Sequence, residues 1–182
     1  MTPASCNIAA ALPRLAAERP DQPAIRCPGR RRPGNGLAAY DVVLDYATLD
    51  ARSDAIAAGL ARHGIGRGVR TVVMVRPSPE FFLLMFALFK AGAVPVLVDP
   101  GIDRAALKQC LDEARADAFI GIGLAHAARL ALGWAKSAQR LVTVGRRWGW
   151  GGPTLARIER DGAGAGPQLA DTGPDEVTAI LF

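Results

Sequence analysis

Residues 70–98 decide the fold, and they read RTVVMVRPSPEFFLLMFALFKAGAVPVLV. The opening apolar run predicts a short strand. Ser78-Pro79-Glu80 then indicates the start of a helix, because Ser caps a helix, Pro fits its first turn and Glu complements its dipole. The long apolar run that follows predicts a helix ending at Gly92, and the valine-rich end predicts a second strand. The stretch is therefore one strand–helix–strand unit.

The same alternation continues along the chain as far as residue 144. The further helices and strands are expected at 103–115, 118–120, 124–134 and 141–144. The strands are short and apolar without alternation, which is typical of a parallel sheet covered by helices on both faces. Right-handed crossovers give a doubly wound, mostly parallel α/β fold whose core repeat spans 70–144.

The region before this repeat predicts four more elements. They are helices at 7–19 and 45–63 and strands at 23–27 and 37–44. Pro13 is expected to strain or kink the first helix, and Asp45 is placed to cap the second. Residues 28–36 are rich in Gly, Pro and Arg and predict a loop.

The region after the repeat changes character. Residues 146–172 are rich in Gly, Trp and Arg and then in Gly, Ala and Pro, so they predict a long exposed connection. Residues 176–182 show the pattern of a buried strand. Because a domain rarely ends inside such a strand, we expect residues 1–182 to be an incomplete N-terminal subdomain of a longer chain.

The composition excludes several classes of protein. Half of the 182 residues are hydrophobic and 21% are charged, which fits a globular protein and not a disordered one. The net charge of +5 is a weak signal for nucleic acid, and the Arg30–Arg32 cluster lies in a Gly/Pro loop, so no nucleic-acid partner is expected. The longest apolar run, Phe81–Phe89, is too short to span a membrane. Residues 1–11 show no secretory signal.

Cysteine and histidine usage points to a reducing cytoplasm without a metal site. The three cysteines are Cys6, Cys27 and Cys110, an odd number with no C-x-x-C motif. They argue against a disulfide framework. A zinc site would need most of these cysteines together with His63 and His126, and buried thiols are the simpler interpretation.

One glycine pattern suggests a different class of protein. Gly121-Ile-Gly123 follows a strand and precedes a helix, as in a dinucleotide fingerprint. However, His126 stands where Gly or Ala is needed, and no acidic residue follows about 20 residues later. An NAD-binding oxidoreductase domain stays as the alternative, and a tight strand-to-helix turn is the favoured interpretation. The patterns at 64–68 and 162–166 lack a preceding strand and are interpreted as a helix stop and a connection.

No residue of the chain is assigned a catalytic, cofactor-binding or metal-binding role. The few serines show no arrangement of an activated nucleophile, and no phosphate-binding P-loop occurs. A third class is a non-catalytic lobe that binds a partner through Trp148-Gly-Trp150, because exposed aromatic side chains can anchor interfaces.

The order of several short motifs resembles the adenylate-forming superfamily of acyl-CoA synthetases, luciferases and peptide-synthetase adenylation domains. The motifs are LFKAGAVPVLVDP at 88–100, LDYATLDARSD at 44–54, GIGRGVR at 64–70 and VTAILF at 177–182. Val69 stands where the family usually has Asp. The resemblance implies that the last motif leads into a phosphate-binding loop beyond Phe182. It identifies the family, while Lys90 is expected only to solvate the end of its helix.

Other stretches are similar to olefin β-lactone synthetases within that superfamily. They lie at 77–82, 98–101, 118–126 and 141–145. This resemblance implies an ATP-dependent, AMP-forming ligase that turns a long-chain 2-alkyl-3-hydroxy fatty acid into a β-lactone with Mg²⁺, in a complex with other olefin-pathway enzymes. Its ATP and Mg²⁺ sites would lie downstream, so residues 1–182 alone would be inactive. A fatty acyl-CoA or acyl-AMP ligase is the alternative, separated by coenzyme A dependence.

Overall fold

The computed structural model describes residues 6–29, 39–99 and 101–182. Its centre is a parallel sheet of five strands in the order β6-β5-β3-β4-β7. Their bounds are β3 (Arg70–Met74), β4 (Val94–Leu97), β5 (Ala118–Ile122), β6 (Arg140–Val144) and β7 (Ile180–Leu181). The predicted α/β fold with a parallel sheet is confirmed.

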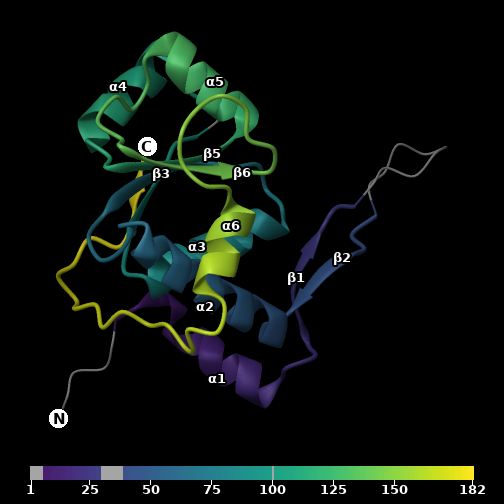
Figure 1. Cartoon of the computed structure of the whole chain (residues 1–182). Coiled ribbons are helices and arrows are strands. Elements are labelled where there is room, and N and C mark those ends of the chain that lie inside the picture. The colour runs from purple at the N-terminus through teal and green to yellow at the C-terminus, as the bar shows by residue number, and fades with distance from the viewer. Residues whose placement is uncertain (1–5, 30–38, 100) are drawn as a thin grey trace.

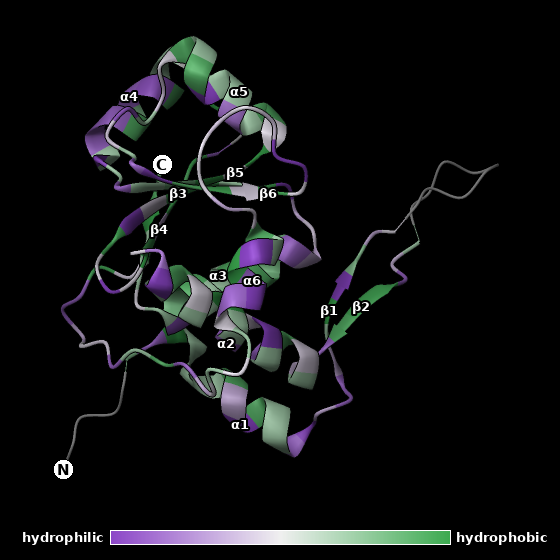
Figure 2. Ribbon diagram, in the orientation of Figure 1, coloured by the Kyte–Doolittle hydropathy of each residue, from purple (hydrophilic) through white to green (hydrophobic). Residues whose placement is uncertain are grey.

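Helices cover both faces of this sheet (Figure 1). One face carries α4 (Arg104–Ala114) and α5 (Gly123–Leu132). The other carries α2 (Tyr46–Arg62), α3 (Pro79–Lys90) and α6 (Leu155–Gly162). Figure 2 shows hydrophilic residues on the visible turns of α4 and α6, as expected for helices with one face in water.

Two hydrophobic clusters form the core, one on each face of the sheet. Neighbouring strand residues alternate between them: Val73 and Ile120 pack toward α2 and α3, whereas Val72 and Phe119 pack on the side of Leu111 in α4. This alternation explains why the strands are apolar at successive positions, since both of their faces are buried.

The N-terminal region forms a short helical segment and a separate hairpin. A 3₁₀ turn, η1 (Ile8–Ala10), leads into α1 (Ala11–Glu18). Pro13 lies in the first turn of α1, where its missing N–H is not needed. Strand β1 (Pro23–Cys27) pairs antiparallel with β2 (Val42–Asp45). The predicted Arg30–Arg32 cluster and most of the predicted loop 28–36 lie outside the described residues.

The C-terminal third corrects two expectations. The region 146–172 is not a bare exposed connection, because α6 lies within it and buries Leu155 and Ile158. The strand predicted at 176–182 is limited to Ile180–Leu181. Glu176 lies outside the sheet, and its side chain accepts a hydrogen bond from the backbone N–H of Gly173.

Candidate functional site

The carboxyl ends of β3 and β5 meet where the chain leaves the sheet on opposite faces. The helix after β3 is α3, on one face, and the helix after β5 is α5, on the other. In open α/β sheets ligands bind in the crevice beside such a switch point. This edge of the sheet is therefore the first place to look for a ligand site.

On the β3 side of this edge, the turn into α3 is as predicted. The Ser78 side chain caps α3 by accepting from the backbone N–H of Phe81, and Pro79 and Glu80 occupy the first turn. Arg76 and Pro77 are exposed before the cap. The turn thus offers polar groups to solvent at the edge, but its capping hydroxyl is already engaged.

On the β5 side, the N-terminus of α5 is covered by the chain after β6. A Cβ atom at Gly123 would lie 3.3 Å from the carbonyl oxygen of Arg146 and 3.6–3.7 Å from the rings of Trp150 and Trp148. A pyrophosphate in a dinucleotide site needs this space at the helix N-terminus. The geometry does not support the NAD-binding alternative. Gly121 belongs to β5, and the chain turns directly from β5 into α5 at Gly123.

His126 is buried beneath the same loop. Its Nε2 lies 3.0 Å from the carbonyl oxygen of Val142, so Nε2 carries the proton, and its ring stacks on Trp150 at 5.1 Å. Nδ1 has no hydrogen-bond partner among the described residues. Burial lowers the pKa of His126, and the nearby Arg129 lowers it further, while the bond to Val142 acts in the opposite direction.

This depressed pKa predicts acid sensitivity. The unfolded imidazole takes up a proton below pH about 6.5 and the folded one does not, so the free energy of unfolding should fall as pH drops below that value. The slope should reach at most about 1.4 kcal/mol per pH unit. Denaturant unfolding at pH 7.5 and 5.5 measures it, and His126→Gln should show a smaller pH dependence than the unaltered protein. An equal dependence in both would show that other groups cause the loss.

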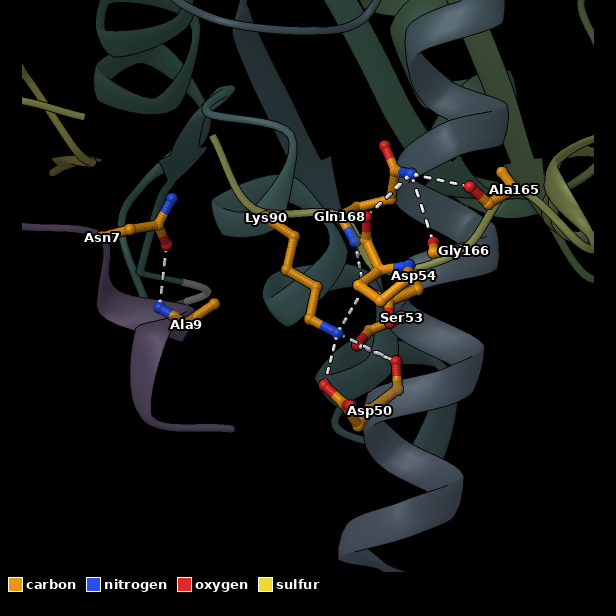
Figure 3. A network of polar contacts seen from close by, with 10 residues as sticks. Asn7, Ala9, Asp50, Ser53, Asp54, Lys90, Ala165, Gly166 and Gln168 are labelled. Carbon is orange, nitrogen blue, oxygen red and sulfur yellow. Dashed lines mark hydrogen bonds and ion pairs between the residues drawn. The ribbon is translucent and has the colours of Figure 1, made fainter. Parts of the chain in front are cut away.

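A second polar centre lies on the α2–α3 side of the sheet and involves Lys90 (Figure 3). The Lys90 side chain is fully buried, and its Nζ lies 2.6 Å from Asp50 Oδ1, 2.6 Å from Asp54 Oδ1 and 2.9 Å from the Asp50 carbonyl oxygen. All three ammonium N–H groups are thereby used. The expectation that Lys90 merely solvates the end of its helix is wrong, because α2 packs over it and supplies two carboxylates.

The same network fixes a segment that is distant in sequence. Asp54 Oδ1 also accepts from the backbone N–H of Gln168, and the Lys90 carbonyl accepts from the N–H of Ala170. The Asn7 side-chain amide donates to the carbonyls of Phe89 and Ala170. We name Asp50, Asp54 and Lys90 the lysine clamp, since they tie α2, α3 and the segment 168–170 together.

An exposed ion pair holds the chain between the segment 168–170 and β7. The Arg67 guanidinium binds both oxygens of Glu176, at 2.9 Å and 2.5 Å. Hydrogen bonds from Arg67 and from the N–H of Gly173 lower the pKa of Glu176 to about 2. Beyond it, the N–H of Phe182 donates to Leu97 and the N–H of Asp99 donates to Phe182, which anchors the chain beside β4.

One feature of the sequence points to the lysine clamp. Asp50 and Asp54 are four residues apart, so they share one helix face. Both lie in the motif at 44–54, and Lys90 lies in the motif at 88–100, so the structure joins the two family motifs through an ion cluster.

The other residues considered from the sequence do not form a metal site. Across residues 6–29, 39–99 and 101–182, no group of three or more His, Cys, Asp or Glu side chains is placed to hold an ion. Cys27 and Cys110 are free thiols, and His63 pairs with Asp161. The part of the chain that the structure describes also has no helix both long and apolar enough to cross a bilayer.

Comparison with known proteins gives a consistent result. The family model described as "AMP-binding enzyme" matches residues 12–182. The chain is 78% identical over 177 residues to the olefin β-lactone synthetase of Stenotrophomonas maltophilia, and the match covers 97% of this chain and 32% of that protein. The olefin β-lactone synthetase of Xanthomonas campestris matches to the same extent. The chain therefore spans about a third of the length of these relatives.

Solved structures show the same fold at low sequence identity. An anthranilate CoA ligase in complex with anthranoyl-AMP superposes with a TM-score of 0.79 at 16% identity, covering 97% of this chain and 32% of that one. A long-chain-fatty-acid-CoA ligase from Archaeoglobus fulgidus superposes with a TM-score of 0.76 at 16% identity, covering 96% of this chain and 34% of that one.

Proposed function

Since this chain belongs to the family of AMP-binding enzymes, we propose that residues 1–182 are the N-terminal subdomain of an ATP-dependent, AMP-forming ligase. The reaction we propose for the whole protein is the conversion of a long-chain 2-alkyl-3-hydroxy fatty acid into a β-lactone. The observation that supports it is the 78% identity to two olefin β-lactone synthetases over nearly the whole chain.

The proposed reaction has two steps. The substrate carboxylate attacks the α-phosphate of ATP, which forms an acyl adenylate and releases pyrophosphate. The 3-hydroxyl oxygen of the same substrate then attacks the acyl carbon, loses its proton and expels AMP, which closes the four-membered lactone. The second step needs no separate acceptor molecule.

The described residues do not by themselves supply a site for Mg²⁺ or the nucleotide phosphates. They hold no cluster of metal-binding side chains, and the N-terminus of α5 at the switch point is covered. The proposal therefore assigns ATP and Mg²⁺ to parts of the enzyme beyond Phe182, and we expect residues 1–182 alone to be inactive. We further propose a cytoplasmic location and association with other olefin-pathway enzymes.

The test measures AMP, pyrophosphate and β-lactone from the full-length protein with ATP and Mg²⁺. With a 2-alkyl-3-hydroxy fatty acid and no coenzyme A, we expect repeated turnover and a lactone product. The matched 2-alkyl fatty acid without the hydroxyl should form at most one acyl adenylate per enzyme, because nothing displaces AMP. If no AMP is released with the hydroxy acid, the proposal fails.

A fatty acyl-CoA or acyl-AMP ligase is the second candidate. Support comes from a salicyl-AMP ligase of Mycobacterium tuberculosis, which is 41% identical over 82 residues, or 45% of this chain. Turnover that depends on coenzyme A and yields a thioester would favour this candidate over the lactone-forming one.

A further inference from the structure

A basic groove lies between the end of α2, the loop after β6 and α6. Its volume is about 470 Å³, and it is lined by His63, Arg147, Arg157 and Arg160 together with residues 152–154. These side chains come from three separate segments of the chain. The tertiary structure therefore gathers cations that the sequence keeps apart.

The carboxylate of Asp161 pairs with only part of the positive charge at this groove. Asp161 accepts from His63 and Arg157, and hydrogen bonds from these two groups lower its pKa. Arg62 donates to the Asp161 carbonyl. Among the described residues, Arg146 and Arg160 have no carboxylate partner, so their charges face solvent.

Two apolar side chains are also exposed here, Trp148 on the loop after β6 and Leu124 in the first turn of α5. Trp148 is 56% exposed and Leu124 is 61% exposed. The Trp148 ring lies at the start of α5, 3.7 Å from the Cβ position of Gly123, the residue before Leu124. Figure 1 shows this loop arching between α5 and α6.

The loop is held rigidly in this arrangement. Trp150 is anchored by a 2.8 Å hydrogen bond to Thr143 Oγ1 and by stacking on His126. Arg147 donates to the carbonyl of Gly152 at 2.6 Å, and Gly152 adopts a φ of 82° that favours glycine. Trp148 is thus presented to solvent by a fixed backbone, which lowers the entropy cost of binding.

We propose that this surface, formed by Leu124, Arg146, Arg147, Trp148, Arg157 and Arg160, binds an anionic lipid surface. Guanidinium groups pair with headgroup phosphates, and a tryptophan beside a leucine suits the interface between headgroups and acyl chains. Exposed arginines from the loop and from α6, next to one exposed tryptophan, fit a flat, uniformly charged sheet. Single-stranded nucleic acid would need a series of stacking aromatics, whereas one exposed ring is present on this loop. The inference does not depend on the proposed reaction.

The experiment is co-sedimentation of the complete natural protein with vesicles. Phosphatidylcholine vesicles should bind little protein. Vesicles that also contain phosphatidylglycerol should bind the protein, and added salt should weaken this binding. The double variant R146S/R160S should lower the partition coefficient about 25-fold, at about fivefold per arginine. Trp148→Ala should lower it about tenfold through lost apolar contact. Neither arginine holds the loop or pairs with Asp161, so the fold should persist.

Matched controls come from exposed residues just after α1, on β1 and in the segment before β2. R19S/R26S removes the same charge, and Tyr40→Ala removes a side chain that is 63% exposed. Both variants should bind the mixed vesicles nearly as strongly as the unaltered protein does. The proposal is overturned if the mixed vesicles bind no protein, if R19S/R26S loses as much as R146S/R160S, or if Trp148→Ala changes nothing. Tighter binding to a single-stranded DNA oligonucleotide than to the vesicles would assign the surface to nucleic acid instead.

Discussion

Replacing Lys90 by Met should lower the free energy of unfolding by about 3 kcal/mol or more, because it leaves two carboxylates without their cation. The Lys90 side chain is fully buried, and those of Asp50 and Asp54 are only 18% and 14% exposed. Water can therefore solvate the orphaned charges only in part. Met retains most of the apolar length of the side chain, so the change isolates the ammonium group. Denaturant unfolding at neutral pH measures the loss.

Two comparisons make this prediction specific. Lys108→Met breaks the exposed pair with Asp112, in which both side chains are nearly half exposed, and should cost less than about 1 kcal/mol. The triple variant K90M/D50N/D54N should recover at least about 1 kcal/mol of the loss, since the buried negative charge is removed as well. If Lys90→Met costs no more than Lys108→Met, the lysine clamp does not stabilise the fold.

Replacing Gly59 by Ala should destabilise the protein by about 2 kcal/mol, although Ala is the better helix former by about 1 kcal/mol. A Cβ atom at Gly59 would collide with the carbonyl oxygen of Ile158 and lie 2.8 Å from its carbonyl carbon. A Cβ atom at Gly162 of α6 would likewise collide with the carbonyl oxygen of Ala55. The two helices thus touch backbone to backbone, and an added methyl group must push them apart. Thermal and denaturant unfolding both report the change.

Gly66→Ala is the matched control. No atom lies within 4 Å of a Cβ at this position, and its φ is not in the left-handed region. This variant should be neutral or stabilise slightly, because Ala reduces the freedom of the unfolded chain. Equal effects at Gly59 and Gly66 would contradict close packing of α2 against α6.

The close contact between α2 and α6 also limits what sequence reasoning could find. α6 is eight residues long and lies in a region rich in Gly and Arg, so the sequence predicted a connection. Only Leu155 and Ile158 mark its buried face, which is too few for a clear helical period. The helix forms because Thr154 caps it and because α2 offers a surface of small residues.

The sequence by itself determined the alternation of strands and helices and the local signals at helix starts. Asp45 and Ser78 cap α2 and α3 through their own side chains, as their positions predicted, and Asp103 caps α4 in the same way. Such caps involve atoms within three residues of each other, so the local sequence contains all that decides them. The apolar strands likewise follow from burial on both faces, and the motifs at 44–54 and 88–100 identified the family.

Tertiary structure alone decided the features that join distant segments. Lys90 is buried because α2 places Asp50 and Asp54 over it, and the basic groove exists because α6 returns beside the end of α2. Glu176 is tied to Arg67 outside the sheet, and the chain pairs with β4 only at Ile180 and Leu181. In each case the partners lie tens of residues apart, and their interaction depends on a packing geometry that neither segment's sequence contains.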